Sequence, residues 1–182
     1  MFKSSTMSGV GTTDDADPGW LTEPELDEWK AVVALMTTLP AALDSQLRSD
    51  AGLNMFEYHI LVQLGESPSR MVAMTDLALL AQGSLSRVSH AVSRLEKAGW
   101  VERTACAEAG RRTGARLTDA GLAKLHDAAP GHVREARRLV VDVLTAEQLT
   151  SLGECARRIV GVANPTIATI LQQQQDRVDE RA

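Results

Sequence analysis

The chain has 182 residues, of which 44% are hydrophobic and 3% aromatic, and its formal net charge is −5 at pH 7. This length suffices for one domain with a sizeable core, and a core of Leu, Val, Ala and Met favours helices over strands. No apolar run is long enough to span a bilayer, and the N-terminus lacks the apolar segment of a secretory signal. We therefore expect a cytoplasmic protein with no membrane partner.

The cysteine and histidine spacing gives no sign of a cofactor. Cys106 and Cys155 lie far apart without a CxxC or Cys/His pattern, so we interpret them as free thiols, with a redox or metal role as the alternative. The four histidines are scattered along the chain. We expect no metal site and no cofactor.

The N-terminal part predicts a tail followed by a long helix. Residues 1–19 are small and polar, which is typical of a disordered segment. Thr22 and Glu25 form a capping-box pattern that opens the first helix. Pro40 is expected to kink this helix. Its apolar stripe consists of Leu26, Trp29, Val33, Met36, Leu43 and Leu47.

Two more helices are predicted before residue 82. Asn54 with Glu57 predicts the cap of a second helix. Its apolar face is Phe56, Ile60, Leu61 and Leu64. Thr75 is expected to cap a short third helix over residues 76–81.

A fourth helix and a hairpin follow. Gln82, Gly83 and Ser84 form a tight turn, and the fourth helix should run over residues 84–98 until Gly99 ends it. Its apolar face is Leu85, Val88, Ala91, Val92 and Leu95. Residues 100–104 and 112–117 are predicted as two short strands around a turn at 109–110.

The C-terminal part is helical. Thr118 should cap a fifth helix that runs towards Leu144, with a kink or a short break at residues 130–131. Thr145 and Gln148 form the capping box of a sixth helix, which is expected to break at residues 164–165. Its apolar stripe is Leu149, Leu152, Ala156, Ile159, Val160 and Ala163. Residues 173–182 are expected to fray.

A basic segment stands out in this acidic chain. Between Gln82 and Arg116, seven Lys or Arg residues stand against three acids, a local excess of four positive charges. A local concentration of basic residues favours a polyanion-binding surface.

The third and fourth helices fit a helix-turn-helix, in which the second helix enters the major groove of DNA. Hydrogen-bonding side chains with few acids line one side of the fourth helix, as a recognition helix requires. Arg87 is the candidate for reading guanine, and the hydroxyls at the helix start suit phosphate contacts. The candidate DNA-binding residues are Ser84, Ser86, Arg87, Ser89, His90 and Arg94. The alternative is an ordinary solvated helix face.

The hairpin adds a second candidate DNA contact. Arg111 and Arg112 directly follow its turn, and arginines at a hairpin tip can enter the minor groove. Surface arginines that only aid solubility are the alternative. A hairpin placed immediately after a helix-turn-helix is typical of a winged helix.

The chain resembles the MarR family of bacterial transcriptional regulators over about residues 20–172. The resemblance is carried by four blocks, Met74–Ala78, Ser84–Ser89, Arg94–Arg103 and Leu117–Gly121, in that order. The family's wing usually carries an Asp-Arg-Arg sequence, which is replaced here by Glu-Ala-Gly-Arg-Arg at residues 108–112. On this alignment Arg111 is the wing-tip arginine and Arg112 the alternate.

The resemblance implies a mainly α fold with a small β-hairpin wing, acting as an obligate homodimer on a pseudo-palindromic double-stranded DNA site. A winged helix-turn-helix domain would cover residues 54–117. A helical dimerisation region would be built from residues 20–53 and 118–172. The long apolar stripes at both chain ends, which one small chain cannot readily cover, agree with this.

Family members commonly release DNA when a small phenolic or aromatic acid binds. The rare aromatic and methionine side chains of the first two helices are candidates for such a pocket: Trp20, Trp29, Met36, Met55, Tyr58 and His59. Core or dimer packing is the alternative for Trp29 and Met36. Oxidant and metal sensing find no support in the cysteine and histidine positions.

The sequence thus predicts a ligand-released, dimeric repressor. The alternative is a dimeric DNA-binding regulator without an effector, controlled by abundance or a protein partner. An enzyme is not indicated, because the chain lacks a glycine-rich phosphate loop, a GxSxG motif and a metal signature. A winged helix used for protein contact is disfavoured by the basic segment.

Overall fold

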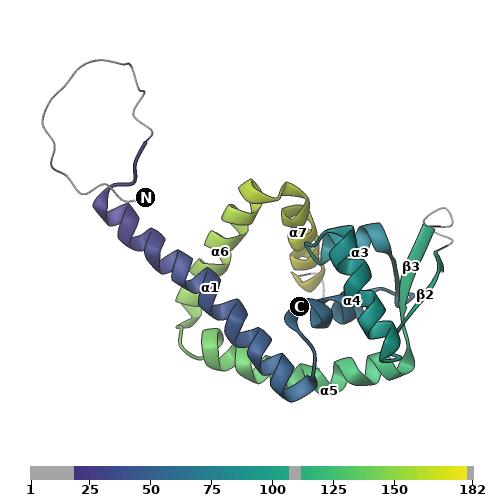
Figure 1. Ribbon diagram of the computed structural model, residues 1–182. Helices are drawn as coiled ribbons and strands as arrows, with labels where there is room; N and C mark the ends of the chain where they lie inside the picture. Colours follow the sequence, from purple (N-terminus) through teal and green to yellow (C-terminus); the bar gives the residue numbers. More distant parts are fainter. Residues whose placement is uncertain (1–18, 107–111, 180–182) are drawn as a thin grey trace, which may run out of the picture. The chain divides into compact units, whose positions relative to one another are not determined.

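The computed structural model describes residues 19–106 and 112–179, which form a mainly helical protein with one small antiparallel sheet (Figure 1). A boundary between two compact units falls between Thr37 and Thr38. The predicted fold class, mainly α with a β-hairpin, is confirmed.

The first helix, α1 (Glu23–Ala51), is continuous across Pro40 and across the unit boundary. It begins as the capping box predicts: the backbone N–H of Thr22 donates to Glu25 Oε2 at 2.8 Å, and the N–H of Glu25 donates to Thr22 Oγ1 at 3.4 Å. Its last part enters the core, where Leu47 and Ala51 are buried.

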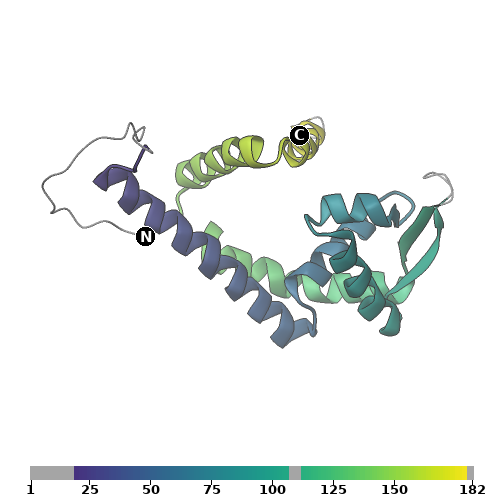
Figure 2. The same ribbon diagram turned by 45° about the horizontal axis from the view of Figure 1, so that its top comes forward.

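The middle of the chain forms the winged helix. Its elements are α2 (Met55–Glu66), β1 (Met71–Ala73), α3 (Met74–Leu80), α4 (Leu85–Lys97), β2 (Val101–Cys106) and β3 (Arg112–Leu117). The sheet order is β1-β3-β2, and all neighbours are antiparallel, with Val101 opposite Leu117 and Met71 opposite Arg116. In the turned view, α3 and α4 stand beside the β2–β3 hairpin (Figure 2). The predicted hairpin strands are confirmed, while the turn between them lies outside the described residues.

The prediction that Thr75 caps the third helix is wrong. Helix α3 begins at Met74, and the extended residue Ala73 is its N-cap, without a side-chain hydrogen bond. The physical reason is β1, a three-residue strand too short to show in the sequence pattern, which delivers the chain directly into the helix. The Thr75 hydroxyl instead donates to Asp76 Oδ1 at 3.2 Å.

The core lies among α2, α3, α4 and the sheet. The predicted apolar face of α2 is buried, as are Val88, Ala91, Val92 and Leu95 of α4. Leu85, which we assigned to the same face, is 51% exposed because it is the first helical residue and lies beyond the packed part of α4. Leu47, Leu53, Leu77, Val101 and Leu117 complete the core.

Of the two alternatives predicted at residues 130–131, the short break is wrong and the kink stays a prediction. Helix α5 (Asp119–Ala136) runs through Pro130 and continues as a π-helix, η1 (Arg137–Val141). A proline removes one helical hydrogen bond, and the packing of the neighbouring Ala128, which is buried, holds the helix in place. The irregular turn falls later, where the N–H of Asp142 donates to the carbonyl of Arg137.

The remaining helices are α6 (Ala146–Ala163) and α7 (Pro165–Asp179). Both capping-box bonds between Thr145 and Gln148 are present, and the predicted break at Asn164 separates the two helices. Helix α7 continues to Asp179, beyond the point at which we expect the chain to fray.

Candidate nucleic-acid interface

Helix α4 begins with a polar, acid-free turn. Ser84 is its N-cap, and the Ser84 hydroxyl accepts a hydrogen bond from the backbone N–H of Arg87 at 3.2 Å. No acidic residue lies in the first turn, and Ser84 and Ser86 are exposed. The amino end of the helix therefore presents free backbone N–H groups and hydroxyls without a competing carboxylate.

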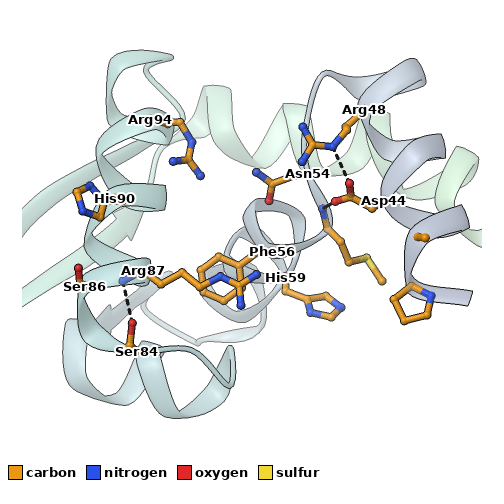
Figure 3. A pocket seen from close by; sticks show the side chains of 13 residues that line it. Asp44, Arg48, Asn54, Phe56, His59, Ser84, Ser86, Arg87, His90 and Arg94 are labelled. Atoms are coloured by element: carbon orange, nitrogen blue, oxygen red, sulfur yellow. Dashed lines mark hydrogen bonds and ion pairs between the residues drawn. The ribbon is translucent and has the colours of Figure 1, made fainter. Parts of the chain in front are cut away.

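The polar stripe predicted on α4 is divided in two. Arg87 and Arg94 reach towards α2, whereas Ser86 and His90 lie at the other edge of the helix (Figure 3). All four are exposed. The two sets of side chains therefore present separate hydrogen-bonding edges along one helix.

Arg87 is stacked on an aromatic ring. Its guanidinium carbon lies 4.0 Å from the centroid of the Phe56 ring, the geometry of a cation–π contact. Stacking covers one flat face of the guanidinium and leaves its N–H edges free. The Phe56 ring in turn fits against the turn before α4, where a Cβ at Gly83 would lie 2.6 Å from Phe56 Cζ.

Arg94 is held by an acid that the sequence analysis treated only as a cap. Arg94 Nε donates to Glu57 Oε1 at 2.5 Å, and Glu57 is 7% exposed. The other oxygen of Glu57 accepts the N–H of Asn54 at 3.1 Å, while the side chain of Asn54 accepts the N–H of Glu57 at 2.9 Å. The Glu57 carboxylate thus joins the start of α2 to the recognition helix.

Ser89 is also engaged within the protein. Arg103 of β2 donates through Nη2 to the carbonyl of Ser89 at 2.9 Å, to Ser89 Oγ at 3.3 Å and to Ser93 Oγ at 2.9 Å. Its Nη1 lies 3.4 Å from Glu96 Oε2. Arg103 therefore ties the wing to α4, a role that its place in the basic segment did not reveal.

Residues 107–111 at the tip of the wing lie outside the described residues, and the candidate Arg111 is one of these five. Arg112 is the first residue of β3, and its Cα partner in the sheet is Cys106. Nearer the base of the hairpin, Arg116 Nε lies 3.5 Å from Glu102 Oε1. The minor-groove contact predicted for Arg111 and Arg112 therefore stays a prediction.

An open cleft of about 870 Å³ separates α4 from the second half of α1 and the start of α2 (Figure 3). Arg48, Arg87 and Arg94 line it together with Asp44. Asp44 is tied to its own helix and to α2: Arg48 Nε lies 2.6 Å from Asp44 Oδ2, and the N–H of Met55 donates to Oδ1 at 2.8 Å. These bonds lower the pKa of Asp44, the one to Arg48 most, so the carboxyl stays ionised.

Only two of the six predicted pocket residues, Met55 and His59, line this cleft. Tyr58 is buried, and its ring centroid lies 4.7 Å from that of His132. Trp20, Trp29 and Met36 do not line the cleft and are at least half exposed. The sequence spacing of the six candidates could not separate the residues that line the cleft from those that do not, because it does not show which side of each helix faces the cleft.

Comparisons with known proteins agree with this geometry. A model of the MarR family matches residues 51–112. The HTH-type transcriptional regulator MhqR of Bacillus subtilis is 32% identical over 111 residues, which cover 59% of this chain and 72% of that protein. The chain belongs to the MarR family of transcriptional regulators. As a winged helix-turn-helix regulator of this family, it is a DNA-binding protein.

Two solved MarR-family structures extend the similarity over most of the chain. Sco3205 of Streptomyces coelicolor, a MarR family transcriptional regulator solved in complex with DNA, is 45% identical with a TM-score of 0.78. The match covers 83% of this chain and 94% of Sco3205. AbsC, from the same organism, is 36% identical with a TM-score of 0.75, over 80% of this chain and 98% of AbsC.

The other features that the sequence analysis considered are peripheral in this MarR-family fold. Cys155 is exposed and free on α6, and Cys106 ends β2. Within residues 19–106 and 112–179, no three potential metal ligands come together and no helix is long and apolar enough to cross a membrane.

Proposed function

We propose that this MarR-family regulator binds a pseudo-palindromic operator as a homodimer, represses transcription and is released by a small aromatic or phenolic ligand. The observation that carries the proposal is α4, a capped helix with no acid in its first turn that exposes Ser86, Arg87, His90 and Arg94. Such groups match the donors and acceptors of the major groove and its phosphate walls. The DNA complex of Sco3205 supports the same use of this fold.

The homodimer is supported by apolar side chains that the single chain leaves in contact with water. Ile159 and Val162 of α6 are 61% and 88% exposed. On α1 the exposed large apolar residues are Trp29, Val32, Val33, Leu35 and Met36. Contiguous apolar surface of this kind marks protein–protein contact. Two copies related by a two-fold axis would present two recognition helices to two half-sites.

The cleft between α4 and α1 supports the small-molecule part. Its volume lies within the range of ligand pockets, and it offers Arg48, Arg87 and Arg94 to an acidic group and Met55 and Phe56 to a ring. A ligand held there would contact Arg87 and Arg94, the same side chains that we assign to DNA. Binding of one would therefore disfavour the other, which is the differential affinity that release requires.

Thermal shift with salicylate-like acids separates this mechanism from regulation without an effector. We expect the best ligand to raise the melting temperature and to release a bound DNA duplex over the same concentration range. Arg48→Ala should reduce both responses without changing DNA binding by the ligand-free protein. A protein that binds DNA tightly and responds to none of these acids would favour control by abundance or a protein partner.

The proposed setting is the cytoplasm, where a bacterial regulator meets its DNA. We assign no catalytic step to the protein.

A further inference from the structure

Two consecutive residues at the start of α2 hold the two arginines of α4 that face it. Phe56 lies beneath the guanidinium of Arg87, and Glu57 accepts from Nε of Arg94. We propose that Phe56 and Glu57 are positioning residues for DNA recognition, which fix the directions in which Arg87 and Arg94 present their remaining donors. This inference rests on the proposed DNA binding and adds residues that do not themselves lie on α4.

The ion pair of Glu57 with Arg94 would be costly to break. Glu57 is buried, and a buried carboxylate is stable only while it is paired and hydrogen-bonded. Both of its oxygens are used, one by Arg94 and one by the N–H of Asn54. If Arg94 turned away to follow a phosphate, it would leave a buried charge without its counterion.

It follows that only the terminal nitrogens of Arg94 remain available to DNA. The side chain of Arg94 is 57% exposed, so the Nη groups are open to solvent while Nε is occupied. The charge of Glu57 also offsets that of Arg94, which reduces its attraction for phosphates in general. The ion pair with Glu57 therefore fixes the direction of the Arg94 side chain and weakens its binding to phosphates of any sequence.

Phe56 restricts the orientation of Arg87 by lying against its guanidinium. The guanidinium carbon of Arg87 lies over the ring, and this contact restricts the side chain, so a bidentate contact to a base would cost less conformational entropy than from a free arginine. The ring is itself fixed, because Phe56 is 9% exposed and wedged against Gly83 in the turn. The start of α2 thus sets both arginines at once.

Glu57→Gln tests the proposal most cleanly. A glutamine at this third helical position still completes the capping box with Asn54, so α2 should form, but the charge that holds Arg94 is gone. Binding would be measured by fluorescence anisotropy on two duplexes of equal length, one selected by the wild-type protein from a random-sequence pool and one unrelated. Salt titrations would be run on both.

For Glu57→Gln we expect the ratio of affinities for the selected and unrelated duplexes to fall about ten-fold, since a base or phosphate contact loses its fixed geometry. We also expect the salt dependence to steepen by about one counterion per freed arginine. In an Arg94→Gln background the same change should add nothing to either quantity. Phe56→Leu should lower the ratio with the salt dependence unchanged.

An equal loss of affinity for both duplexes, with an unchanged salt slope, would overturn the positioning role and leave only a structural one. If Glu57→Gln does not fold, Arg94→Lys decides, because lysine keeps a charge opposite Glu57 but lacks the Nη fork: an unchanged affinity ratio would reject the role of Arg94. Failure of the wild-type protein to select any duplex would instead refute the proposed DNA binding itself.

Discussion

Arg87 is the side chain of α4 that we propose as the main reader of base sequence. Its spacing from His90 and Arg94 predicts that the three side chains share one polar side of the helix. In the structure, Arg87 and Arg94 face α2, whereas His90 lies at the other edge of α4 (Figure 3). The sequence could not predict that Glu57, 37 residues before Arg94, supplies its counterion, because nothing local links the two. The local sequence pattern identifies Glu57 as part of a capping box and Phe56 as a core residue. Neither pattern indicates that these side chains also contact α4.

For Arg87→Ala we expect a loss of about 1–3 kcal/mol of binding free energy on the selected duplex, because a bidentate base contact disappears. The unrelated duplex should lose far less. Lys124→Ala provides a matched control: Lys124 also lies over an aromatic ring, 5.1 Å from the centroid of Trp100, but on α5. Equal losses on both duplexes for Arg87→Ala would remove its base-reading role.

His132 predicts a pH dependence of folding. Its Nδ1 is buried without a hydrogen-bond partner among the described residues. Burial lowers the pKa of His132 from its ordinary value of 6.5, and the charge of the nearby His59 lowers it further. The unfolded chain therefore binds this proton more tightly, so the contribution to stability is complete above pH 6.5 and falls as the pH drops below it.

The melting temperature of the wild-type protein should accordingly fall on acidification below that pH, and His132→Gln should show a shallower fall because glutamine does not titrate. Differential scanning fluorimetry across a pH series measures both. Parallel curves for the two proteins would mean that His132 does not contribute.

At the scale of elements, local sequence patterns predicted most helix N-caps. The start of α3 and the continuity of α5 depend on contacts that the local sequence does not show. Asn54, Thr118 and Thr145 each accept the backbone hydrogen bond expected of an N-cap. The prediction for Thr75 was wrong because a short sheet strand sets the start of α3. The break expected at residues 130–131 was wrong because packing holds α5 together across its proline.

The junction between the wing and α5 depends on Gly121. A Cβ at this position would lie 2.0 Å from the carbonyl oxygen of Trp100, a contact with backbone that cannot move aside. Gly121→Ala should therefore destabilise the fold by about 2 kcal/mol in urea denaturation, in the range of overpacked sites. Gly161→Ala in α6 meets no atom within 4 Å and should gain up to about 1 kcal/mol. A stable Gly121→Ala protein would contradict this packing.

At the scale of the whole molecule, the proposed operator binding requires a second copy of the chain. The sequence predicted long apolar stripes, and in the structure much of the α1 and α6 stripes is exposed. What the sequence could not show is how far the winged helix completes its own core, with Leu77, Val88 and Leu117 almost fully buried. The winged helix therefore buries its own core within one chain, and we propose that a second copy of the chain covers the α1 and α6 surfaces.

The most direct test is the mass of the protein–DNA complex, determined by sedimentation velocity on the selected duplex. We predict two protomers per duplex for the wild-type protein. For Ile159→Glu/Val162→Glu we predict a folded monomer that binds the duplex at least ten-fold more weakly, since two half-sites are no longer held together. Thr150→Glu, an exposed change nine residues before Ile159 and on the opposite side of α6 from it, should behave as wild type. One wild-type protomer bound per duplex, or full-affinity binding by the monomeric variant, would contradict the account.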